Sequence, residues 1–212
     1  MSFPIRSGQT LLFIGDSITD CGRRAAEGPY GNGYVKHCVD LIRAKYPERR
    51  INFVNEGIGG NTVLDLRHRW HDDVLVHKPN FLTIKIGIND LHRTMGDPDS
   101  LPPKRYEELY REILDLTRKH TKAKITLIDP FYLSTDSDSG GNRSQVLERL
   151  PGYVRVVGKL AKEFGTGHVE THKLFQKQLK YEPADTFCPE PVHPNASGHM
   201  VISLGLLEAL EW

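Results

Sequence analysis

The sequence predicts an α/β fold in which helices cover both faces of a parallel β-sheet. Short apolar runs alternate along the chain with segments in which apolar residues recur at helical spacing. The runs are continuously apolar, which is typical of strands buried on both faces. No internal repeat, low-complexity tract or linker divides the 212 residues, so we expect a single domain over residues 1–212.

Five short segments are expected to form the strands. The first is the run TLLFI, which ends at a glycine, and the fifth is short and weak. The expected strands cover residues 10–14, 51–54, 81–86, 124–129 and 168–170. A glycine-rich turn at 56–61 follows the second strand, and polar loops are expected at 95–103 and 134–144, the latter as a flexible lip.

Six segments are expected to form helices between and after these strands. Pro47 and Pro79 end the first two, because proline cannot continue a helix interior. Pro151 suits the first position of the fourth helix. The expected helices cover residues 33–46, 63–77, 104–120, 151–164, 171–179 and 194–210.

The charge balance and the cysteines exclude several classes of protein. With 28 Lys plus Arg and 27 Asp plus Glu, the net charge is +1, which favours neither nucleic acid nor an anionic membrane as a partner. No run of about 18 apolar residues predicts a membrane span, and the first eight residues are too polar for a signal peptide. A cytoplasmic location is therefore expected.

Cys21, Cys38 and Cys188 form no CxxC pair, which favours free thiols over a disulfide or zinc site.

A possible nucleophile follows the first expected strand, in the segment GDSITD. In a parallel sheet, chemistry lies in the crevice beyond the carboxyl ends of the strands, and Ser17 stands in a turn at that place. A helix that starts there offers backbone N–H groups to a developing oxyanion. Alternatively, Asp16 and Ser17 only begin a helix, as both residue types commonly do.

Two possible oxyanion donors follow the second and third strands. Gly60 lies in GIGGNT, where glycines let the backbone approach a ligand. Asn89 lies in GIND and carries a side-chain NH₂ that can donate to the same oxyanion. Each residue alone is equally consistent with an ordinary turn.

A possible base lies near the C-terminus, in EPVHPN. A serine alcohol is a poor nucleophile until a base removes its proton, and His193 stands in a loop from which an imidazole can cross the crevice. Glu190, three residues earlier, can orient that imidazole. We expect only surface or capping roles for the other histidines considered. These are His68, His71, His77, His92, His120, His168, His172 and His199.

The four segments together resemble the motifs of the SGNH (GDSL-type) hydrolase family. GDSITD, GGNT, GIND and VHPN occur in the family's order and span residues 15–195. The resemblance implies a flavodoxin-like, three-layer α/β/α sandwich with five parallel strands. It also implies Ser17 as nucleophile, His193 as base, and an oxyanion hole formed by the N–H groups of Ser17 and Gly60 and the side chain of Asn89. This chemistry requires no metal and no organic cofactor.

The acid of the triad departs from the family pattern. The family usually has Asp three residues before the histidine, and this chain has Glu190, flanked by Pro189 and Pro191. The extra methylene shifts the carboxylate, although glutamate is the acid in other Ser-His-acid enzymes. Spacing favours Glu190, Asp185 is the alternative, and a dyad without an acid is the third possibility.

The expected function is hydrolysis of small acyl esters, above all acetyl esters of carbohydrates. The stretches FIGDSITDCGR and VHPNASGHM are most similar to small intracellular acetyl esterases of the family that act on xylan-derived sugars, which implies a homo-oligomer. Asp20, Arg23, Arg93 and the 134–144 loop are expected to offer polar groups to sugar hydroxyls. The alternatives are a lysophospholipase or thioesterase, and a non-catalytic binding module on the same fold.

Overall fold

The computed structural model describes residues 3–135 and 140–212, and a five-stranded parallel sheet lies at its centre. The strands are β1 (Thr10–Gly15), β2 (Asn52–Gly57), β3 (Phe81–Lys85), β4 (Lys124–Ile128) and β5 (Gly167–Val169). Their order across the sheet is β2-β1-β3-β4-β5, and each neighbouring pair is parallel. The prediction of about five parallel strands is confirmed.

Helices connect the strands and cover both faces of the sheet. They are α1 (Ser17–Asp20), α2 (Tyr34–Lys45), α3 (Val63–Trp70), α4 (Ile88–Gly96), α5 (Pro103–His120), α6 (Asn142–Phe164), α7 (Thr171–Gln178) and α8 (Ala196–Ala209). Helix α3 continues into one π-helical turn (His71–Leu75), and a short 3-10 turn spans Ala184–Thr186. None of the helices in the described ranges combines the length and apolar character that a membrane span requires.

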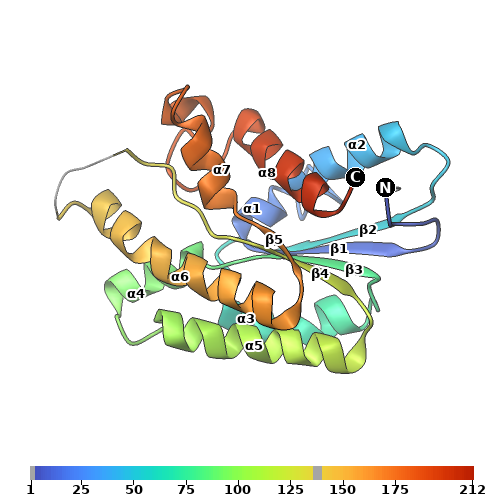
Figure 1. Cartoon of the computed structure of the whole chain (residues 1–212), viewed down its shortest axis with the longest axis horizontal. Coiled ribbons are helices and arrows are strands. Elements are labelled where there is room, and N and C mark those ends of the chain that lie inside the picture. The colour runs from blue at the N-terminus through green and yellow to red at the C-terminus, as the bar shows by residue number, and fades with distance from the viewer. Residues whose placement is uncertain (1–2, 136–139) are drawn as a thin grey trace.

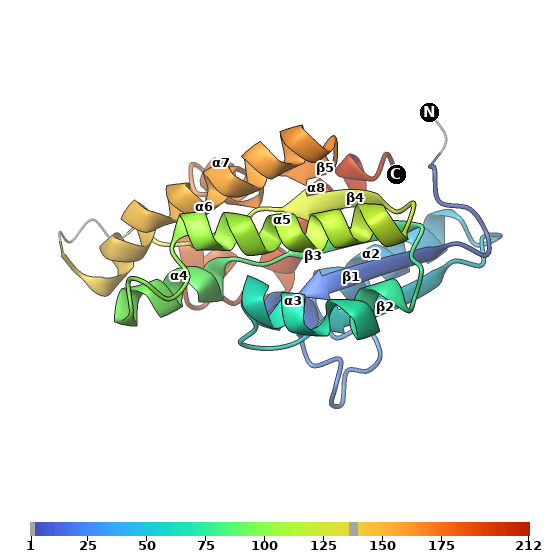
Figure 2. The ribbon, with the colours of Figure 1, turned by 90° about the horizontal axis from the view of Figure 1, so that it is seen from below.

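The helices form two layers with the sheet between them, as expected from the sequence. Helices α2, α7 and α8 lie on one face, and both α2 and α7 pack against α8 (Figure 1). Helices α3, α5 and α6 lie on the other face, where α5 contacts both of its neighbours (Figure 2). The three-layer α/β/α sandwich is therefore confirmed.

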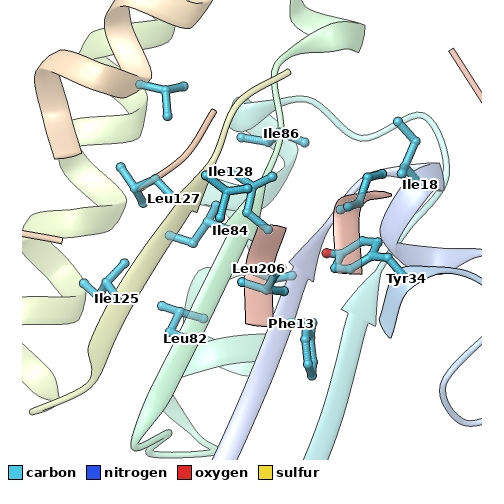
Figure 3. Close-up of a cluster of buried hydrophobic side chains, with 14 of the residues drawn as sticks. Phe13, Ile18, Tyr34, Leu82, Ile84, Ile86, Ile125, Leu127, Ile128 and Leu206 are labelled. Atoms are coloured by element: carbon cyan, nitrogen blue, oxygen red, sulfur yellow. The ribbon is translucent and has the colours of Figure 1, made fainter. Parts of the chain in front are cut away.

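The core consists of the strand side chains and the helix residues packed against them. Leu11 to Ile14 of β1 are all fully buried, which agrees with a strand covered on both faces. Figure 3 shows Phe13 close to Tyr34 of α2 and Leu206 of α8, and the rings of Phe13 and Tyr34 meet edge to face at 6.2 Å. This packing holds the strand that carries Ser17 at its end.

Two helices differ from the sequence-based expectation. Helix α4 begins at Ile88, so Asn89 lies in the first turn of a helix rather than in an open turn. Helix α6 begins at Asn142, nine residues before Pro151, and therefore the prediction that Pro151 starts this helix is wrong. The helix continues through the proline because Val146, Leu150 and Tyr153 form one buried stripe, and their burial outweighs the missing backbone hydrogen bond. The expected 134–144 loop accordingly loses its last residues to α6, and 136–139 lie outside the described residues.

Candidate active site

The register of the sheet brings the predicted site segments to one edge. Gly15, the last residue of β1, pairs with Gly57 at the end of β2 and with Lys85 at the end of β3. The segments that carry Ser17, Gly60 and Asn89 therefore leave the sheet side by side. This is the carboxyl edge, where parallel α/β proteins carry their chemistry.

Ser17 is the first residue of α1, directly after the tight turn at the end of β1. The Asp16 side chain caps this helix by accepting the Ile18 N–H at 3.0 Å, so the capping interpretation holds for Asp16 and leaves the Ser17 hydroxyl free for another partner. Asp16 is fully buried and also pairs with the buried ammonium of Lys85, at 3.2 Å between Nζ and Oδ2. A buried ion pair therefore lies beneath the turn that presents Ser17.

Ser17, His193 and Glu190 form a continuous chain of hydrogen bonds. Ser17 Oγ lies 2.9 Å from His193 Nε2, and His193 Nδ1 lies 2.5 Å from Glu190 Oε1. A carboxylate beside Nδ1 favours the tautomer with its proton on that nitrogen, which leaves Nε2 to accept the Ser17 proton. The residues predicted for nucleophile, base and acid are thus brought together in the predicted order.

The Glu190 carboxylate is held by its own loop. Its two oxygens accept the N–H of Val192 at 2.9 Å and the N–H of His193 at 2.7 Å. Partial burial alone would raise the pKa of Glu190, but these two bonds and His193 outweigh burial and lower it. The carboxylate therefore stays ionised at neutral pH, and it is positioned to stabilise an imidazolium.

Asp185, the alternative acid, has a different environment. It lies in the 3-10 turn at Ala184–Thr186, where its backbone carbonyl, rather than its carboxylate, faces the Asn195 side chain. Within the described residues its carboxylate makes no hydrogen bond or ion pair with His193. The geometry favours Glu190 because its carboxylate is the one in contact with the imidazole.

The turn after β2 lies beside Ser17. A Cβ placed on Gly59 would be only 3.8 Å from the Cβ of Ser17, and Gly60 has a φ of +78°, a conformation that favours glycine. The N–H groups of Ser17 and Gly60 find no acceptor within ranges 3–135 and 140–212. Two unpaired donors beside a nucleophilic oxygen are the arrangement that an oxyanion hole requires.

The side chain of Asn89 completes this group of donors. Its Nδ2 donates to the backbone carbonyl of Asn61, next to Gly60, at 2.9 Å. An amide nitrogen carries two hydrogens, and this bond uses one of them, so the other remains for a ligand. The contact also fixes the position of Asn89 relative to the Gly60 turn.

Two residues expected at the rim support the turn instead. Arg23 donates to the Gly57 carbonyl at 2.7 Å and pairs with Glu56 at 2.9 Å, and its side chain is only 15% exposed. Asp20 is buried and accepts the Gly59 N–H at 3.1 Å. These contacts use one oxygen of Asp20 and part of the Arg23 guanidinium, so both side chains support the turn rather than standing open at a rim as expected. Arg93 is half exposed and contacts Asp65 at 3.4 Å.

Two other histidines are closer to this region than the sequence suggested. His199 is buried, its Nδ1 accepts the Tyr34 N–H at 3.1 Å, and its Nε2 lies 3.2 Å from Cys21 Sγ. Burial lowers the pKa of His199 to about 4, so this ring is neutral and structural. His92 lies near enough to Glu190 and His193 to interact with them electrostatically. The only sequence signal that places His92 near the site is its i,i+3 spacing from Asn89. That spacing puts both residues on one face only if the segment is a helix, which the structure shows for α4.

A serine, a histidine and a carboxylate bonded in this order beyond a parallel sheet form the arrangement of a Ser-His-acid hydrolase. The chain belongs to the GDSL-like lipase/acylhydrolase family, whose model matches residues 13–201. This membership confirms the resemblance drawn from the four motifs. The protein is accordingly a carboxylic ester hydrolase.

Individual relatives agree with this assignment. The chain is 39% identical to an acetylxylan esterase of Geobacillus stearothermophilus over 98% of its own length and 97% of the relative. A crystal structure of that esterase matches with a TM-score of 0.86 at 38% identity, covering 98% of this chain and 96% of that one. An α/β hydrolase from the metagenome of Lake Arreo, Spain, matches with a TM-score of 0.87 at 30% identity, covering 99% and 98%. Crystal structures of three catalytic mutants of the Geobacillus esterase are known, and these replace a serine, an aspartate and a histidine respectively.

Proposed function

We propose that this protein removes acetyl groups from small xylan-derived carbohydrates through an acyl-enzyme on Ser17. The observation that carries the proposal is the 2.9 Å contact between Ser17 and His193, in a chain 39% identical along nearly its whole length to an acetylxylan esterase. Glu190 is the proposed acid. The proposed oxyanion donors are the N–H groups of Ser17 and Gly60 and the side chain of Asn89.

The proposed reaction has two steps that use the same residues. Ser17 Oγ attacks the ester carbonyl carbon while His193 Nε2 accepts the hydroxyl proton, and the Glu190 carboxylate stabilises the imidazolium. The tetrahedral oxyanion is bound by the three donors, each worth roughly 3 kcal/mol in comparable serine hydrolases. Collapse expels the alcohol, which takes the proton from His193. Water then attacks the acetyl-Ser17 ester in the same way, releasing acetate and restoring the serine.

A polar cavity beside the acid supports a polar substrate. It measures about 280 Å³ and is lined by Ser134, Thr135, Arg143, Asp185 and Glu190, among others. Polar side chains in this number suit hydroxyl groups better than a long acyl chain. A larger hollow of about 310 Å³ includes Phe81 and Lys124, at the amino ends of β3 and β4, where parallel-sheet enzymes do not carry their chemistry.

The test combines labelling with a comparison of substrates. A fluorophosphonate should label the wild type and leave Ser17→Ala unlabelled, and that variant should retain less than about a tenth of wild-type turnover with an unchanged melting temperature. Acetylated xylo-oligosaccharides should be deacetylated, and 4-nitrophenyl acetate should be cleaved faster than 4-nitrophenyl octanoate. A preference for the octanoate would instead favour the lipolytic alternative, and an unlabelled wild type would favour a binding module.

Two further expectations are part of the proposal. A homo-oligomer is expected by analogy with the esterases that the chain resembles, and light scattering on the purified protein measures its mass directly. A cytoplasmic location, without a membrane or nucleic-acid partner, is checked by fractionating the cells that express the protein naturally.

A further inference from the structure

His92 is an ionisable group at the site that the proposed reaction does not use. It follows Asn89 by three residues on α4, so both side chains project from one face of that helix. Its ring meets the ring of Tyr132 edge to face, with centroids 6.2 Å apart and planes at 84°. His92 therefore lies between the Asn89 turn and the segment that follows β4.

That segment joins His92 to the loop of the triad. Leu133, next to Tyr132, donates its N–H to the carbonyl of Pro191 at 2.9 Å, and Pro191 follows Glu190 directly. The charges of Glu190 and His193 both act on the His92 ring, which agrees with this neighbourhood. Asn89, His92 and the His193 loop thus border the same stretch of the carboxyl edge.

No described residue uses the hydrogen-bonding capacity of His92. Across the described residues, neither ring nitrogen has a hydrogen-bond partner, and neither is sealed from solvent as Nδ1 of His37 and Nδ1 of His172 are. By contrast, His193, His168 and His199 all have polar partners. His92 thus combines a half-buried ring with free nitrogens at a catalytic edge.

The lowered pKa of His92 also favours the neutral form of the ring at neutral pH. Burial lowers the pKa of His92, the charge of Glu190 acts in the opposite direction, and His193 adds to the lowering. A neutral imidazole offers one donor and one acceptor, which is also what a hydroxyl group offers. The uncharged ring therefore suits a polyol better than an anionic ligand.

We propose that His92 is a specificity-determining residue, which hydrogen-bonds a free hydroxyl of the substrate next to the ester being cleaved. The inference rests on the proposed function, since it assumes that the alcohol is a carbohydrate. It assigns His92 no part in proton transfer, because His193 already contacts Ser17.

The experiment compares esters with and without a free hydroxyl. His92→Leu removes the donor and the acceptor, and His92→Asn keeps one of each. His71→Ala is the matched control, because His71 is 77% exposed and lies in the π-helical turn. The substrates are a monoacetylated xylo-oligosaccharide, glycerol monoacetate and 4-nitrophenyl acetate, the last of which has no hydroxyl.

With His92→Leu, kcat/KM for the two hydroxyl-bearing esters should fall roughly tenfold, the value of one lost hydrogen bond, while 4-nitrophenyl acetate changes less than about threefold. His92→Asn should recover part of the loss, and His71→Ala should match the wild type on all three substrates. Equal losses on all three esters, or no loss on either hydroxyl-bearing ester, would overturn the inference. Melting temperatures identify a variant that fails to fold. If His92→Leu fails to fold, His92→Asn decides the result: equal losses on all three esters, or no loss on either hydroxyl-bearing ester, would overturn the inference.

Failure of the proposed function can be distinguished from failure of the inference about His92. A wild type that cleaves 4-nitrophenyl acetate but deacetylates no xylo-oligosaccharide contradicts the carbohydrate assignment. The comparison of glycerol monoacetate with 4-nitrophenyl acetate then still tests His92. If His92→Leu does not separate these two esters, the inference is wrong on its own.

Discussion

The carboxylate of Asp90 accepts the backbone N–H of Val63 at 2.9 Å and thereby ties the start of α4 to the start of α3. Asn89, directly before Asp90, donates to the carbonyl of Asn61. Two consecutive residues of α4 therefore hold the turn that contains Gly60. Asp90 is fully buried, and its second oxygen, Oδ2, has no partner in the described part of the chain.

From this double contact we expect Asp90→Ala to lower kcat about tenfold with little change in KM. The oxyanion donors act in the transition state, and removing one donor lowers kcat about a hundredfold or more. Loss of the Asp90 contact only loosens the position of two donors, so it should lower kcat by less. Asp90→Asn keeps an acceptor for the Val63 N–H and should stay within about threefold of the wild type. Steady-state kinetics on 4-nitrophenyl acetate measure both. A loss in Asp90→Asn as large as in Asp90→Ala would show that the hydrogen bond to Val63 is not the cause.

Asp90 should also make stability depend on pH. Burial raises the pKa of Asp90 from 3.8 to about 7, although the N–H of Val63 acts in the opposite direction. Between these two values the folded protein keeps a proton that the unfolded chain releases, so this contribution to stability is lost as pH rises. Asp90→Asn does not titrate. Its melting temperature relative to the wild type should therefore rise by about 5 °C or more from pH 5 to pH 8. A constant difference in differential scanning fluorimetry would contradict the raised pKa.

Glu190→Gln should lower kcat much more than it raises KM, because it keeps the volume and removes the charge beside His193. Asp185→Asn is the matched control and should be mild, since its carboxylate does not contact the imidazole. Because the pKa of Glu190 is lowered, the charge should be present throughout the neutral range in which both variants are assayed. A large loss in Asp185→Asn with normal Glu190→Gln would reverse the assignment, and two mild variants would indicate a Ser17-His193 dyad.

Lys85→Met should destabilise the protein by about 3–5 kcal/mol, because it leaves the buried carboxylate of Asp16 without its partner. The exposed pair of Lys36 and Asp40 provides the control, and Lys36→Met should cost less than about 1 kcal/mol. Urea denaturation measures both. The double variant Lys85→Met with Asp16→Asn should be less destabilised than the sum of its two single variants. Additive effects would show that the pair does not interact.

The sequence alone predicted the layers, the five strands and the residues that now meet at the carboxyl edge. Continuous apolar runs such as 10–14 identify buried strands, since that pattern depends only on neighbours along the chain. Ser17, Gly60, Asn89 and His193 were recognisable because each follows a strand or lies in the loop before the last helix, and because their segments occur in the order of the family's motifs. Glu190 was favoured by spacing alone, and a local interval of three residues is short enough for the chain to place both side chains together.

Tertiary structure alone decided which polar side chains are free and which are already paired. Asp20 and Arg23 were expected at an open rim, but the register of β1 and β2 brings Gly57 and Gly59 to them, and each side chain forms a hydrogen bond with that turn. Pro151 was expected to begin a helix, but burial of the residues before it extends α6 back to Asn142. His92 reaches the site through α4 and Tyr132, forty residues further along the chain. Such contacts depend on which distant segments the sheet brings together, and no local pattern of residues contains that information.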